Sequence, residues 1–286
     1  MKLIRILMLI SGLSTLAACG ENELLEDYFV KEPRVLAVKI QDPEVKPQDT
    51  VTMRMLVGGK DIDQNMTVTV LWAIDDVEPV PLGYSNYTQE FESQISPDTL
   101  EEGEWYDLPI LARIQVRQKY LNAQKVLRVT QNPVGKNPVI SGVRLQYLIG
   151  KQLVEKTVAN ADINALPVNT TNVALTAVTE DLTPEENEKL IFRWFITTSK
   201  NTDGKLYIQT DSKHIEAILG KEAKASEIRR SAVFSLQGKD GKKGVQSGIY
   251  DLYLVVRDNA TDPQSQFDER HGTDFMYFTI CINSNC

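Results

Sequence analysis

From residue 33 onward, apolar and polar side chains alternate with a period of two, as they do in β-strands that bury one face. The clearest alternations run over residues 36–40, 51–57 and 68–74. Prolines and glycines separate these runs, among them Pro43 and the glycine pair at 58–59. This combination predicts an all-β protein whose strands are joined by turns.

A repeat indicates that the chain holds two similar modules. The segment YDLPILAR at residues 106–113 returns as YDLYLVVR at residues 250–257. Upstream of each copy, a strand pattern carries a tryptophan at its centre, Trp72 in the first and Trp194 in the second. Two modules of one kind in tandem explain both coincidences.

The second copy carries a family resemblance. A tryptophan strand followed by Gly-x-Tyr-x-Leu-x-Leu at residues 248–254 resembles the C and F strands of immunoglobulin-like β-sandwiches. The resemblance implies that both tryptophans pack between two sheets and that Tyr250 is the corner tyrosine. In the first copy the neighbours Trp105 and Tyr106 leave the register of that corner open.

The second module is longer than the first. Its tryptophan and tyrosine lie 56 residues apart, against 34 in the first module. Residues 213–230 carry apolar side chains at helical spacing, and residues 183–186 resemble a helix capping box. We therefore expect antiparallel sandwiches, the second with short helical insertions.

The N-terminus combines Lys2 and Arg5, an apolar run over residues 6–16 and small residues before Cys19. Eleven residues are too few to span a hydrocarbon core about 30 Å thick. The sequence Leu-Ala-Ala-Cys resembles the lipobox of bacterial lipoproteins. The resemblance implies cleavage before Cys19 and fatty acylation, for example with palmitate, and Gly20 favours the outer membrane. The alternative is an ordinary secreted protein that keeps a thiol by chance.

These patterns divide the chain into four segments. Residues 21–32 are acidic, with only Lys31 opposing, so we expect them to form a solvated tether. The segments are a signal peptide at 1–18, the tether at 19–32, and immunoglobulin-like domains at 33–135 and 136–286.

Charge and cysteine content narrow the functions further. Loss of residues 1–18 changes the net charge from −8 to −10, which disfavours nucleic acid as a partner. In the oxidising exported context, Cys281 and Cys286 flank a turn-prone tetrapeptide and predict a disulfide that stabilises by about 2 kcal/mol. Two free thiols or a soft-metal pair are the alternatives.

The sequence gives little support for a catalytic or metal-binding site. The only histidines, His214 and His271, belong to no nucleophile or metal motif, so we expect no enzyme and no cofactor. A calcium-loop pattern begins at Asp61 but lacks its turn glycine at Met66. Five acids gather between the last two strands, where a solvated loop is the default and a calcium site is the alternative: Asp258, Asp262, Asp268, Glu269 and Asp274.

The charges are unevenly distributed. Residues 61–112 hold twelve acids and no Lys or Arg, whereas residues 113–154 hold eight Lys or Arg and no acid. In a sandwich these stretches form neighbouring strands, so cross-strand charge pairing is the first interpretation and a polarised binding face is the second.

We therefore expect a non-catalytic envelope protein, held at the membrane by its lipid anchor, that binds another envelope protein. The alternative is a lipoprotein that binds carbohydrate or peptidoglycan through stacking aromatics. The aromatic candidates are Tyr84, Tyr87, Phe91, Trp105 and Tyr106.

Overall fold

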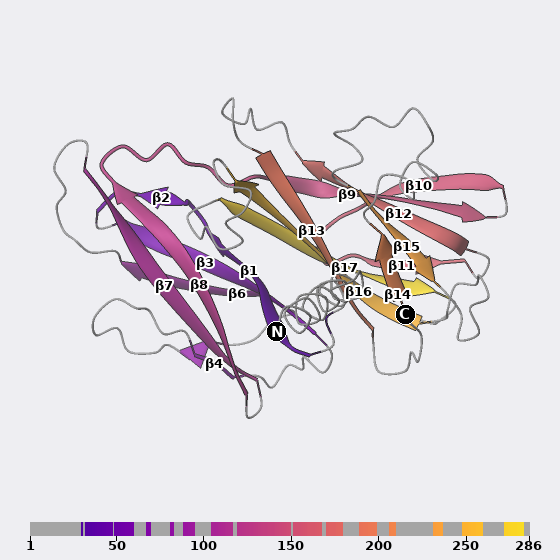
Figure 1. The fold of residues 1–286 in the computed structure, drawn as a ribbon, viewed down its shortest axis with the longest axis horizontal. Coiled ribbons are helices and arrows are strands. Elements are labelled where there is room, and N and C mark those ends of the chain that lie inside the picture. Colours follow the sequence, from indigo (N-terminus) through magenta and orange to yellow (C-terminus); the bar gives the residue numbers. More distant parts are fainter. Residues whose placement is uncertain are drawn as a thin grey trace, which may run out of the picture.

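The computed structural model shows β-strands as the regular elements of the part of the chain that it describes, as the alternation predicted. The strands form four sheets, and the chain passes through two sheets before it enters the other two (Figure 1). The described residues are 30, 32–47, 49–59, 67–69, 81–82, 88–94, 104–116, 119–149, 151–167, 170–179, 189–198, 206–209, 231–236, 248–259 and 272–282.

The first sandwich has a three-stranded sheet in the order β1-β3-β6 and a five-stranded sheet in the order β2-β8-β7-β4-β5. The short strand β2 runs parallel to β8, whereas the other pairs are antiparallel. The strands are β1 (Arg34–Ile40), β2 (Glu44–Val45), β3 (Thr50–Gly58), β4 (Thr67–Thr69), β5 (Pro81–Leu82), β6 (Thr88–Gln94), β7 (Trp105–Val116) and β8 (Lys119–Thr130).

The second sandwich repeats this plan with sheets in the orders β10-β9-β12-β15-β14 and β11-β17-β16-β13. Here β11 runs parallel to β17, as β2 does to β8. The strands are β9 (Ile140–Ile149), β10 (Gln152–Val158), β11 (Ile163–Leu166), β12 (Thr170–Thr179), β13 (Lys189–Thr198), β14 (Leu206–Gln209), β15 (Ser231–Leu236), β16 (Gly248–Asn259) and β17 (Thr273–Ile282).

These strand orders are those of immunoglobulin-like sandwiches, which place strands A, B, E and D in one sheet and C, F and G in the other. In the second sandwich β9, β12, β15 and β14 take the first set, and β13, β16 and β17 take the second. The expectation of two tandem immunoglobulin-like sandwiches is confirmed.

The core of the second sandwich contains the residues that its sequence singled out. Trp194 on β13 lies opposite Leu254 on β16, and both are buried among apolar side chains of the two sheets. Tyr250 is 3% exposed and opposes Ile280 of β17. In the first sandwich Tyr106 opposes the buried Val129 in the same way, which resolves the register that the sequence left open.

Burial of the Tyr250 phenol predicts alkaline sensitivity. Removal from water raises the pKa of Tyr250 to about 12, against 10.0 for the ordinary group. Above pH 10 the unfolded chain loses this proton while the folded chain keeps it, so stability falls between about pH 10 and 12, by about 2 kcal/mol. Denaturant unfolding across this range should show the stability gap between the wild type and Tyr250→Phe closing by that amount. A gap that stays constant with pH would contradict the prediction.

Strand β1 departs from the simple alternation. The sequence placed Leu36, Val38 and Ile40 on one face, but the register shifts between Val35 and Ala37. Val38 and Ile40 are buried opposite methionines of β3, whereas Leu36 joins Ala37 in a second apolar cluster outside the sandwich. The bulge therefore gives β1 two buried faces.

Several predicted features lie outside the described residues. These are Trp72, the helical insertion at 213–230 and the capping box at 183–186.

Candidate functional site

The second apolar cluster, which we call the junction core, lies between the two sandwiches. Strands β1 and β3 of the first sandwich cover the outer face of β16 and β17 in the second. Phe195 and Tyr277 pack against its edge. Its buried members are Val30, Leu36, Ala37, Leu56, Tyr253, Val255 and Phe275.

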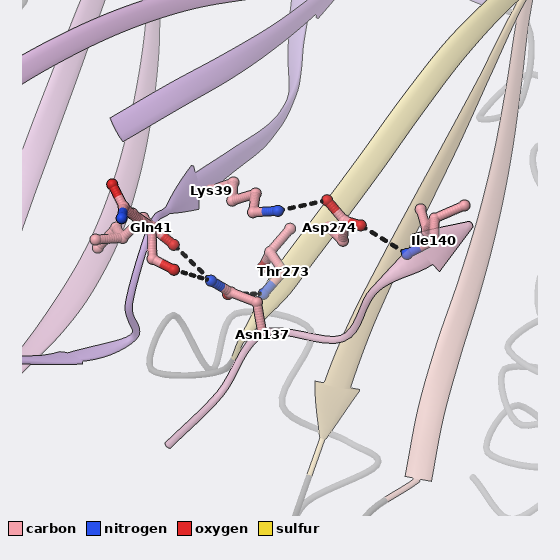
Figure 2. A network of polar contacts seen from close by, with 7 residues as sticks. Lys39, Gln41, Asn137, Ile140, Thr273 and Asp274 are labelled. Atoms are coloured by element: carbon pink, nitrogen blue, oxygen red, sulfur yellow. Dashed lines mark hydrogen bonds and ion pairs between the residues drawn. The ribbon is translucent and has the colours of Figure 1, made fainter. Parts of the chain in front are cut away.

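A polar network flanks the junction core and involves the segment that joins the sandwiches (Figure 2). The side-chain amide of Asn137 donates to the carbonyl oxygens of Ile40 and Gln41, each at 2.7 Å. Its Oδ1 accepts from the backbone N–H of Thr273 at 2.8 Å. One side chain thus joins β1 of the first sandwich to β17 of the second.

Asp274 makes the second connection (Figure 2). Its Oδ1 lies 2.7 Å from Lys39 Nζ, and its Oδ2 accepts from the backbone N–H of Ile140 at 2.7 Å. The Lys39 and Asp274 side chains are 22% and 12% exposed, so solvent screens this ion pair only partly. Nearby, Lys125 Nζ donates to Thr273 Oγ1 at 3.0 Å in a buried contact.

Two further cations are placed by the junction. The guanidinium of Arg34 lies over the Phe195 ring, and that of Arg54 lies over the Phe275 ring, at 5.2 and 5.8 Å from the ring centres. Each pairs a first-sandwich cation with a second-sandwich aromatic, a favourable electrostatic contact.

The segment that joins the two sandwiches, residues 131–139, passes so close to the start of β17 that a glycine is needed at position 272. We call this segment the linker. A Cβ on Gly272 would lie 2.8 Å from the carbonyl oxygen of Lys136 and 3.0 Å from the Cα of Asn137. These are backbone atoms, so the clash would displace the linker that carries the amide contacts.

The N-terminal segment also reaches the second sandwich. Val30 is 1% exposed, and its N–H donates to the carbonyl oxygen of Ile196 on β13 at 2.8 Å. At Val30 the expectation of a solvated tether is therefore wrong, because this residue fills the junction core. Both ends of the first sandwich are consequently fastened to the second.

A different arrangement marks the open face of β7 and β8. Trp105 is 56% exposed, and the guanidinium of Arg128 lies 4.2 Å from the centre of its ring. Arg128 in turn donates to both carboxylate oxygens of Asp107, at 3.0 and 3.3 Å. The Asp107 carboxylate thus orients the Arg128 guanidinium, which in turn packs against the Trp105 indole.

Asp107 and Arg128 also bear on the charge distribution. They are directly opposite partners on β7 and β8. Cross-strand charge pairing is therefore confirmed at this position.

The remaining candidate residues are placed as follows. Of the five acids proposed for calcium, Asp274 is engaged by the junction, and Asp258 lies beside Gly272 with its backbone N–H bonded to that residue's carbonyl. Asp262, Asp268 and Glu269 lie outside the described residues. The part of the chain that the structure describes contains no group of three or more His, Cys, Asp or Glu able to hold a metal ion.

Cys281 is fully buried and disulfide-bonded. Cys286 lies outside the described residues, so its pairing with Cys281 stays a prediction.

Other candidates from the sequence also lie outside the described residues, namely Cys19, His214, His271, Tyr84 and Tyr87. Phe91 and Tyr106 are placed by their backbone alone. Within the described residues, none of the helical structure is both long and apolar enough to span a bilayer.

Sequence reasoning missed most of the junction. Its apolar members did leave a signal, because residues 55–57 and 252–256 are apolar at every position. An unbroken apolar run of this kind indicates a strand that is covered on both faces. Lys39, Asn137 and Thr273 left none, since polar residues in strands and linkers are usually solvated.

Comparison with known proteins identifies no family. No protein-family model matches the sequence, and no curated protein matches it. Similar solved structures include a chimeric titin Z1Z2 (TM-score 0.23, 9% identity, 90% of this chain and 99% of that chain). Others are three N-terminal domains of the outer capsid protein Hoc of bacteriophage RB49 (TM-score 0.22, 7% identity, 88% and 100%) and a protein of unknown function from Porphyromonas gingivalis W83 (TM-score 0.19, 12% identity, 86% and 99%). TM-scores this low carry no argument, so the immunoglobulin-like assignment rests on the strand order.

Proposed function

We propose that this chain is a non-catalytic lipoprotein of the bacterial cell envelope, anchored through Cys19 in the outer membrane. Its two sandwiches act as one rigid arm that presents a binding face to another envelope macromolecule. The observation that carries the proposal is the junction, where an apolar core, an ion pair and the Asn137 amide fix one module on the other. A hinge between independent modules would not need these contacts.

The position of Val30 sets how far the arm stands from the membrane. Val30 lies eleven positions after Cys19, and a fully extended chain over that distance spans about 40 Å. An anchor on Cys19 would therefore hold the junction, rather than one tip of the molecule, within about 40 Å of the bilayer surface.

Replacement of Cys19 tests the anchor. We expect the wild-type protein to sediment with membranes and to lack residues 1–18, with a mass increase for two or more acyl chains, since two chains give stable attachment. Cys19→Ser should move the protein to the soluble fraction. Cys286→Ser removes another cysteine without touching the lipobox and should leave attachment unchanged. A wild-type product that starts at Met1, or that carries a bare Cys19 thiol, would refute the proposal.

One observation favours the alternative of a carbohydrate- or peptidoglycan-binding lipoprotein. Trp105, a stacking candidate from the sequence, is exposed and held in place by Arg128. An ordered, exposed indole is a suitable platform for a ligand because little conformational freedom is lost on binding.

A further inference from the structure

The outer face of β8 continues the surface that Trp105 begins. Residues 125, 127 and 129 are buried, and the residues between them therefore lie on the opposite face of the strand. Tyr120 is 60% exposed, and Asn122 and Gln124 are also exposed. We call this surface the β8 strip, and it consists of Trp105, Tyr120, Asn122, Gln124, Val126 and Arg128.

The strand register gives the strip its length. Trp105 lies opposite Thr130 at one end of β8, and Gln115 lies opposite Tyr120 near the other. Thr130 lies ten positions after Tyr120, which corresponds to about 34 Å along an antiparallel strand. The two exposed aromatic side chains thus mark the ends of a long, narrow surface with amide side chains between them.

The chemistry of the strip suits a particular ligand class. Aromatic faces pack against apolar surface, and the ring face of a sugar presents C–H groups. Amide side chains both donate and accept hydrogen bonds, as sugar hydroxyls do. Asp107 and Arg128 on this face form an ion pair, and the register also places Arg113 on it, opposite Asn122.

The corresponding face of the second sandwich shows what a protein-binding surface looks like in this chain. There Tyr253, Val255 and Phe275 present continuous apolar surface, and the first sandwich covers it. The β8 strip instead exposes the amides of Asn122 and Gln124 between its two aromatic side chains. This contrast favours a polyhydroxylated polymer over a second protein.

We propose that the β8 strip binds an extended polysaccharide, with sugar rings stacked on Trp105 and Tyr120 and hydroxyls bonded to the amides between them. The inference rests on the proposed function, because an anchored arm would meet glycan strands within the envelope. It adds the ligand class, the face and the residues that bind.

The test uses full-length lipidated protein in detergent micelles, with purified peptidoglycan and a panel of neutral polysaccharides as probes. We expect binding to at least one probe, with affinity rising with oligosaccharide length. Trp105→Ala should weaken binding by about tenfold, which corresponds to one stacking contact. Tyr120→Ala should leave short oligosaccharides unaffected and abolish the gain for long ones. Ile163 is a similarly exposed apolar residue on β11, so Ile163→Ala is the matched control and should bind as the wild type does.

Absence of binding to every probe by folded protein would overturn the inference, as would equal binding by wild type, Trp105→Ala and Tyr120→Ala. Crosslinking of the strip to an envelope protein that glycans do not displace would assign the face to a protein instead. The mass of the N-terminal residue, measured on the same preparation, separates the two proposals. Acylated protein without glycan binding overturns only the β8 strip, and glycan binding by unacylated protein overturns only the anchor.

Discussion

Replacement of Asp274 by alanine is expected to release the two sandwiches from each other. The change removes the partner of Lys39 and the acceptor for the Ile140 N–H, both at 2.7 Å. An ammonium group that stays largely buried without its carboxylate costs about 3–5 kcal/mol. We therefore expect the unfolding of Asp274→Ala to separate into two transitions, and interdomain distances measured by paired spin labels to broaden.

A matched control separates the junction from the sandwich. Asp251 accepts a 2.8 Å hydrogen bond from Thr279 Oγ1 within the second sandwich. Asp251→Ala should therefore lower the stability of that sandwich without broadening the interdomain distances. The pair Lys39→Met with Asp274→Leu should recover much of the lost stability, because it leaves no charge unpaired. If Asp274→Ala kept a single narrow distance distribution, the junction would not be what fixes the two modules.

Trp194→Ala is expected to destabilise the second sandwich by about 3–5 kcal/mol, because the cavity left by a buried indole cannot close completely. Trp194 is 1% exposed and belongs to the core between the two sheets. Denaturant unfolding of the second sandwich measures the loss.

The same substitution at Trp105 is the natural comparison. Trp105 is 56% exposed, so Trp105→Ala should cost no more than about 1 kcal/mol, mainly from its contact with Arg128. The variant thereby remains suitable for glycan binding tests. Equal losses at the two tryptophans would contradict the assignment of Trp194, and not Trp105, to a core.

The accuracy of the sequence predictions depended on whether the signal was local. Met53 and Met55 were expected in a buried face, and both are fully buried. Leu36 was expected on the same face as Val38. A bulge that the local sequence does not predict instead directs its side chain toward the junction core. Val30 was expected in solvent because its neighbours are acidic, and the second sandwich buries it.

The sequence alone determined the strands, their buried faces and the presence of two similar modules. Alternation with a period of two requires only neighbouring residues, and a sandwich core follows from pairing those faces. Only the tertiary structure decided how the modules are joined. Lys39 and Asp274 lie 235 positions apart, and Asn137 bonds to residues 96 and 97 positions before it. Contacts over such separations depend on the packing of complete sheets, so no pattern within one segment can encode them.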